Sequence, residues 1–173
     1  MAVVACAVPP DSALGPDAIA DAWFRDAYRA PLTRPELGIV DIYAAVFGHT
    51  PLYAKLLLIA RNAVARLVGL KTPPLSSILH PDIGGNYTVG DEIGPWPVFA
   101  IGSSEIVAGR DNRHLDFRVS VLRQDSAQGA SVTVSTICQV HNLAGKIYLL
   151  FVIPFHRFGV RRLVRNAAEA GRL

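Results

Sequence analysis

One predicted strand alternates polar and apolar side chains in a pattern that could serve acid–base chemistry. In residues 114–124 the polar face carries His114, Asp116 and Arg118, and the opposite face is apolar at Leu115, Phe117, Val119 and Val121. Inside a cavity, Asp116 could orient His114 as a base while Arg118 holds an oxyanion. A solvated outer face, with Asp116 and Arg118 as an ion pair, explains the same residues. Both interpretations are open.

Tyr148 and His156 are the candidate polar groups of the long apolar segment near the C-terminus. His156 directly follows Pro154-Phe155, and a proline inside a helix frees a backbone carbonyl that His156 could bind instead of a ligand. A buried phenol such as Tyr148 needs a hydrogen-bond partner, which a ligand can supply, although simple core packing is the alternative. Tyr148 and His156 therefore join the three strand residues as catalytic candidates.

Metal and cofactor motifs do not occur in the sequence. The five histidines show no HxH or HExxH spacing and fall in different predicted elements. There is no G-x-S-x-G elbow, no P-loop and no G-x-G-x-x-G, and Gly84-Gly85 and Gly102 are expected in turns. We therefore expect neither a metal nor a cofactor.

The composition indicates one domain covering residues 1–173, because 51% of the residues are hydrophobic and only 18% are charged. The net charge of +3 is a weak indication of nucleic-acid binding, and we expect none. Arg157, Arg161 and Arg165 complement the dipole at the helix end, with docking to an acidic partner or to lipid headgroups as the alternative.

The two ends of the chain carry one cysteine each, Cys6 near the start and Cys138 in a predicted strand, which indicates free thiols in a reducing compartment. The opening MAVVACAVPP has no basic region and only a short apolar run, so we expect cytoplasmic residence. The uncharged apolar run Ile147 to Phe155 is far shorter than the ~20 residues that span a bilayer, so stable membrane insertion is not expected.

The order of predicted elements is strand, helix, helix, antiparallel strands and a long terminal helix. Strands are expected at 3–8, 23–32, 98–108, 114–124 and 131–140, and helices at 35–47, 52–70 and from Asn142 to about 165. In the second helix, Leu52, Leu56 and Ile59 mark the face expected to be buried. The loop at 71–97 carries Tyr87 and Trp96, which could line a cavity mouth or only pin the loop to the sheet. The order predicts an α+β helix-grip fold, a curved antiparallel sheet wrapped around the last helix, with the two shorter helices closing one end.

Three segments carry a resemblance to a known family: GHTPLYAKLLLIARNAVARLVGLKT, HLDFRVSV and HNLAGKIYLLFVIPFHR. They resemble the domain of unknown function 2867 family, whose members occur alone or fused behind NAD(P)-binding reductase-like domains. The layout is also similar to the helix-grip group of START, birch-pollen-allergen and polyketide-cyclase proteins. This similarity implies a deep cavity for a sterol, a polyketide or another hydrophobic molecule, although a fold does not determine a function.

The function expected from this likeness is the binding of a small hydrophobic, oxygenated molecule resembling a polyketide or a terpenoid. The protein would then catalyse cyclisation, isomerisation or dehydration without a cofactor, as in natural product biosynthesis. Ligand contacts are expected from Tyr87, Trp96, Phe117, Phe151 and Phe155. A non-catalytic carrier or sensor, and an interaction module using the basic helix, are the alternatives, and a homodimer is left open.

Overall fold

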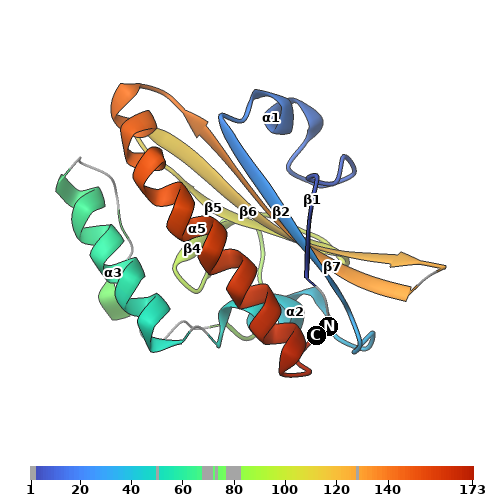
Figure 1. Ribbon diagram of the computed structural model, residues 1–173. Helices are drawn as coiled ribbons and strands as arrows, with labels where there is room; N and C mark the ends of the chain where they lie inside the picture. The colour runs from blue at the N-terminus through green and yellow to red at the C-terminus, as the bar shows by residue number, and fades with distance from the viewer. Residues whose placement is uncertain (1–2, 50, 68–71, 73, 77–82, 128) are drawn as a thin grey trace.

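Seven antiparallel strands form one sheet, and a long helix packs across one of its faces (Figure 1). The computed structural model describes residues 3–49, 51–67, 72, 74–76, 83–127 and 129–173. The strands are Val4–Cys6 (β1), Phe24–Pro31 (β2), Glu92–Ile93 (β3), Trp96–Ile101 (β4), Glu105–Asp111 (β5), Leu115–Ser126 (β6) and Gly129–Val140 (β7). The helices are Pro16–Asp21 (α1), Ile39–Phe47 (α2), Leu52–Leu67 (α3) and Leu143–Glu169 (α5).

The hairpin of β6 and β7 forms the centre of the sheet. Its register runs from Leu115 opposite Val140 to Ser126 opposite Gly129, and Gly129 has a positive φ of 118° at the turn. The sheet order is β1-β2-β7-β6-β5-β4-β3, so β2, from early in the chain, pairs with the last strand. Because side chains alternate along each strand, β6 presents Phe117 and Val119 to α5 and Asp116 and Arg118 to the opposite face.

Helix α5 begins where the change of period predicts it. The side chain of Asn142 accepts a hydrogen bond of 3.2 Å from the backbone N–H of Gly145, which satisfies one of the free donors of the first turn. Its inner face is buried against the sheet at Tyr148, Leu149, Val160 and Val164. By length and composition alone α5 could cross a membrane, and 22% of its most apolar window is buried in the fold.

Helix α2 closes one end of the space between α5 and the sheet. Ile42, Tyr43 and Val46 are almost fully buried in the same core cluster as Val164 and Leu173 of the C-terminal part. Helix α3 lies beside α5 (Figure 1). The predicted α+β layout, with a curved sheet, a long terminal helix and shorter helices, is therefore confirmed.

Two local predictions are wrong. The strand expected at 98–108 is the hairpin of β4 and β5, which turns at Gly102, whose N–H donates to the carbonyl of Glu105 at 2.8 Å. Helix α3 is rotated relative to the prediction: Leu52 and Leu56 are 67% and 55% exposed, whereas Asn62 and Ala65 are buried.

Helix α1 was not predicted. The C-terminal end of the helix expected at 52–70 and much of the 71–97 loop lie outside the described residues.

Candidate functional site

A cavity of about 310 Å³ lies between the sheet and helices α2, α3 and α5. Its walls are largely aliphatic and aromatic, with Phe24 from β2, Phe117 from β6, Leu149 and Val152 from α5, and Trp96 from β4. The size falls at the lower end of the range of small-molecule sites, about 300–1,000 Å³. Apolar walls with a few polar groups are typical of such sites, so the polar members of the lining decide what the cavity can do.

Arg61 and Tyr148 form the first polar group of the lining. The guanidinium carbon of Arg61 lies 5.3 Å from the centroid of the Tyr148 ring, and Nη1 donates to Oδ1 of Asn62 at 2.9 Å. Burial lowers the pKa of Arg61 from its ordinary value, an effect that Tyr148 and Cys138 partly oppose. No carboxylate in the described part of the chain forms an ion pair with Arg61. A cation with an arginine's very high pKa nevertheless stays protonated at neutral pH.

The hydroxyl of Tyr148 has no hydrogen-bond partner among the described residues, although the side chain is only 4% exposed. Desolvation raises the pKa of this phenol; nearby Arg61 lowers it and Cys138 raises it further. The phenol is therefore neutral at physiological pH and can donate a hydrogen bond. Leaving such a group unsatisfied costs about 1–3 kcal/mol, which a bound oxygen acceptor would recover.

His156 and Asp26 form the second polar group, at the inner face of α5. Nε2 of His156 lies 3.1 Å from Oγ1 of Thr136 and 3.4 Å from Oδ1 of Asp26, whose side chain is 10% exposed. The hydroxyl of Tyr28 donates to the other carboxylate oxygen at 3.3 Å. In the tautomer whose Nε2–H faces these partners, Nδ1 of His156 carries the lone pair that can accept a proton, and no hydrogen bond to Nδ1 is seen within the described ranges.

Strand β7 links the two polar groups. Thr136 contacts His156, and Cys138, two residues further on the same face, interacts electrostatically with both Asp26 and Arg61. Two residues along a strand span roughly 7 Å, and Thr136 and Cys138 both line the cavity. The arrangement offers a carboxylate-supported imidazole at one position and two hydrogen-bond donors, one of them cationic, at the other.

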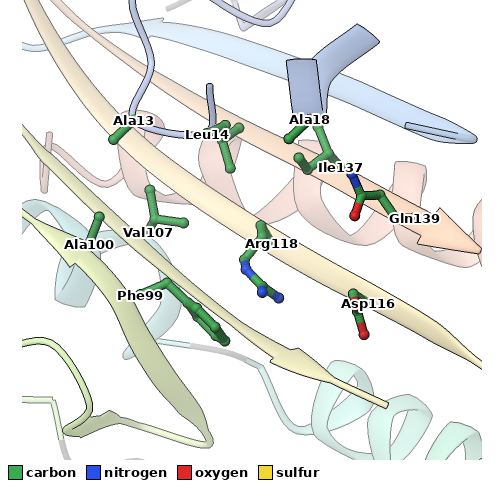
Figure 2. Close-up of a pocket in the computed structure, with 10 residues that line it drawn as sticks. All are labelled: Ala13, Leu14, Ala18, Phe99, Ala100, Val107, Asp116, Arg118, Ile137 and Gln139. Carbon is green, nitrogen blue, oxygen red and sulfur yellow. The ribbon is translucent and has the colours of Figure 1, made fainter. Parts of the chain in front are cut away.

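The predicted site residues His114, directly before β6, and Asp116 and Arg118, on β6, lie elsewhere. Asp116 and Arg118 line a separate cavity of about 160 Å³ on the opposite face of the sheet, beside Ala18 of α1 (Figure 2). Asp116 contacts Nε2 of His141 at 3.0 Å instead of His114, and Arg118 pairs with Asp111 at 2.6 Å. The expectation that His114, Asp116 and Arg118 act together in the cavity under α5 is therefore wrong, and the proposed Asp116–Arg118 ion pair is not formed.

On that face the polar side chains already have partners within the protein. Nδ1 of His114 lies 3.0 Å from Oδ1 of Asn142, the residue that caps α5. The guanidinium of Arg118 also stacks over Phe99, 3.5 Å from the ring centroid. The protein itself thus supplies the hydrogen-bond partner of His114 and the charge partner of Arg118, which indicates a structural role for these two residues.

Of the expected ligand contacts, Trp96, Phe117 and Phe155 line the cavity under α5, as do Tyr148 and His156. Tyr87 packs against the core instead, and its hydroxyl accepts a hydrogen bond from the N–H of Gly84 at 3.0 Å. Phe151 is 71% exposed and does not contribute to the lining. Tyr87 and Phe151 are therefore corrected to positions outside this cavity.

Sequence reasoning missed Arg61, Asp26 and Thr136. Asp26 had a readable signal, because it is an acid at an inward position of β2, between Phe24 and Tyr28. Arg61 had none, because the periodicity of its helix marked the face of Leu52 and Leu56 as buried, whereas these two are exposed and Arg61 lines the cavity.

The thiol of Cys138 provides a reporter of the cavity. Burial, together with the nearby charge of Asp26, raises its pKa to about 12, and Arg61 opposes the change. At pH 8 we expect iodoacetamide to modify Cys138 at least about 100-fold more slowly than Cys6, which is only partly buried. Because the folded thiol keeps its proton to a higher pH than the unfolded one, this group also lowers stability as the pH rises from about 9 to about 12. Peptide mass spectrometry after timed labelling measures the two rates, and equal rates would contradict the buried position.

These features define an α+β protein with an apolar cavity held between a curved sheet and a terminal helix. The family model described as a protein of unknown function (DUF2867) matches residues 18–163, and the chain belongs to that family. The match covers the sheet from β2 onward, α2, α3 and most of α5, and thus every residue of both polar groups. Neither a curated protein nor a solved structure matches the chain.

Proposed function

We propose that the chain binds a small hydrophobic, oxygenated molecule in the cavity under α5 and moves a proton beside its carbonyl group. This chemistry underlies cofactor-independent isomerisation, cyclisation and dehydration. The observation that carries the proposal is the pair of Arg61 and Tyr148, which both line the apolar walls: among the described residues the guanidinium has no carboxylate partner and the buried hydroxyl has no acceptor. A ligand with a carbonyl or enolate oxygen would satisfy both.

The walls favour a ligand of polyketide or terpenoid type. Rings and methyl groups would pack on Phe117, Leu149 and Val152, where burial contributes about 25 cal/mol per Å² of apolar surface. A single oxygen near Tyr148 would then be fixed in orientation, because hydrogen bonds in a dry site are strong and directional. The free thiols Cys6 and Cys138 suit a reducing compartment such as the cytoplasm.

In the proposed step, Nδ1 of His156 accepts the proton from the carbon beside the carbonyl. The C–H electron pair forms the enolate double bond, and the carbonyl π pair moves to oxygen, where Arg61 and Tyr148 stabilise the negative charge. Asp26 stabilises the resulting imidazolium through Nε2. Return of the proton from the imidazolium to another atom completes an isomerisation. Attack of the enolate carbon on a second carbonyl gives a ring, and the new alkoxide takes that proton. In a dehydration a β-hydroxyl takes the proton and leaves as water.

A carrier or sensor is the second candidate, because the same cavity and donors would hold a ligand without the base. The two functions differ only at His156: a carrier does not require proton transfer. An interaction module built on a filled core is a poorer fit, since about 310 Å³ of space lies under α5.

Replacing Arg61 with methionine is expected to weaken the binding of 8-anilinonaphthalene-1-sulfonate, an apolar anion, by about tenfold or more. A hydrogen bond to a charged group contributes about 1.5–3 kcal/mol, and Arg61→Met removes it while keeping the length of the side chain. Fluorescence titration measures the dissociation constant. The matched control is Arg66→Met on the same helix, whose exposed side chain donates to Thr72 at 2.9 Å. Equal losses in the two variants would remove Arg61 from the site.

A further inference from the structure

The outward face of α5 is unusually apolar. Six large side chains spaced three, four or one residues apart are exposed: Leu143 by 69%, Ile147 by 49%, Leu150 by 62%, Phe151 by 71%, Phe155 by 65% and Phe158 by 62%. At 3.6 residues per turn these positions fall on one side of the helix, opposite the buried Leu149, Val160 and Val164. A contiguous exposed apolar patch of this kind is typical of a site that contacts another protein or a membrane.

The positive charge of the same helix indicates which kind of partner this face binds. Between Leu143 and Ala168 the sequence contains no Asp or Glu. Lys146, Arg157, Arg161 and Arg162 are all exposed, and the last two continue the outward face beyond Phe158. The face is therefore apolar over its first turns and cationic over the following ones.

An anionic lipid surface complements both the apolar part and the cationic part of this face. Acyl chains accept the phenylalanine and leucine side chains, and phosphate groups accept the arginines. A second copy of the chain would bring the same cations to the interface, and the single acid of α5, Glu169 at its last position, already pairs with Arg165. The helix would lie along the surface, since its inner face stays packed on the sheet through Tyr148 and Val164.

The apolar face also meets the cavity. Phe155 and Phe158 line the cavity under α5 and are at the same time 65% and 62% exposed. A hydrophobic molecule dissolved in the bilayer could thus pass between these rings without crossing water. We propose that the outward face of α5 docks on an anionic membrane surface and that the cavity exchanges its ligand there. The second clause rests on the proposed function, whereas the docking does not.

The test is sedimentation of the full chain with vesicles of pure phosphatidylcholine or of phosphatidylcholine with 30% phosphatidylglycerol, in roughly 0.1 M salt. We expect binding to the anionic vesicles only. The double change Ile147→Glu with Phe151→Glu should abolish it, and Arg161→Gln with Arg162→Gln should weaken it about thirtyfold, at roughly fivefold per cation. Val89→Glu, at a loop residue that is 65% exposed, is the matched control and should bind as wild type.

Each outcome decides between partners. The docking proposal is overturned if wild-type protein binds neither vesicle type, or if Val89→Glu loses as much vesicle binding as the α5 variants. A wild-type dimer in analytical ultracentrifugation that Ile147→Glu with Phe151→Glu converts to a monomer, without vesicle binding, assigns the face to a second copy. Ile147 and Phe151 do not line the cavity, so unchanged binding of 8-anilinonaphthalene-1-sulfonate by that variant separates this result from the proposed function.

Discussion

A His156→Gln variant is expected to lose the proton-transfer activity of the cavity while still binding an apolar probe. The glutamine amide can donate to Thr136 in place of Nε2, and Asp26 keeps its hydrogen bond from Tyr28. The amide has no nitrogen lone pair that takes up a proton near neutral pH, so the base is gone. Removing a positioned general base lowers the rate by roughly 10²–10⁴-fold.

The measurement is deuterium exchange at the carbon beside the carbonyl of 1-tetralone, an apolar aromatic ketone, in D2O, followed by mass spectrometry. His114→Gln is the matched control, because His114 lies near the cap of α5 and not in the cavity lining. Tyr148→Phe should slow exchange less than His156→Gln, since Arg61 still holds the oxygen. Wild-type protein that binds the ketone without exchanging its hydrogens would make the protein a carrier, and equal losses in the two histidine variants would contradict the assignment of the base.

The elements with strong local signals were predictable. The strand expected at 114–124 begins one residue before β6, the strand expected at 131–140 falls inside β7, and the first helical residue after Asn142 is Leu143. Alternation of apolar residues, a polar cap and a change of period are all properties of neighbouring residues, so they need no knowledge of the rest of the fold. The long hairpin and the terminal helix follow from them directly.

The wrong predictions concern packing between elements. On the face of α3 predicted as buried, Leu52 and Leu56 are exposed and Ile59 is half-buried. Arg61 lines the cavity instead, and Asn62 is buried. Hydrophobic periodicity identifies the inward face only where the interior is a packed core. Here the interior is a cavity with polar groups, and its wall takes a charged side chain.

Packing between elements also explains why the predicted catalytic candidates of β6 lie on the other face of the sheet. Alternation on β6 shows that Asp116 and Arg118 share a face, but both faces of the sheet are covered, by α5 on one side and by α1 on the other. The polar row could therefore have faced either helix. Its partners Asp111 and His141 come from strand ends that only the register brings close. By contrast Tyr148 and His156, chosen as polar residues of an apolar helix, do line the cavity.

The position of α5 over the cavity depends on one close approach, and Gly145→Ala is expected to lower the free energy of unfolding by about 3 kcal/mol. A Cβ at Gly145 would collide with the carbonyl oxygen of His114 and would lie 3.0 Å from the carbonyl carbon and 3.1 Å from a methyl group of Val140. That carbonyl oxygen is fixed by the N–H of His141 at 3.0 Å, so the strand end does not yield easily. The first turn of the helix must move instead, and Gly145 then loses its bond to the Asn142 cap.

The opposite change on the same helix is the control. Gly159 is also helical, but an added Cβ meets nothing within 4 Å. Gly159→Ala should therefore raise stability by about 0.5–1 kcal/mol through helix propensity alone. Thermal unfolding followed by circular dichroism should show a melting temperature roughly 6–12 °C lower for Gly145→Ala and slightly higher for Gly159→Ala. If both alanines stabilise the chain, the backbone of α5 does not meet the carbonyl of His114 before β6 as described, and the position of α5 over the cavity loses its support.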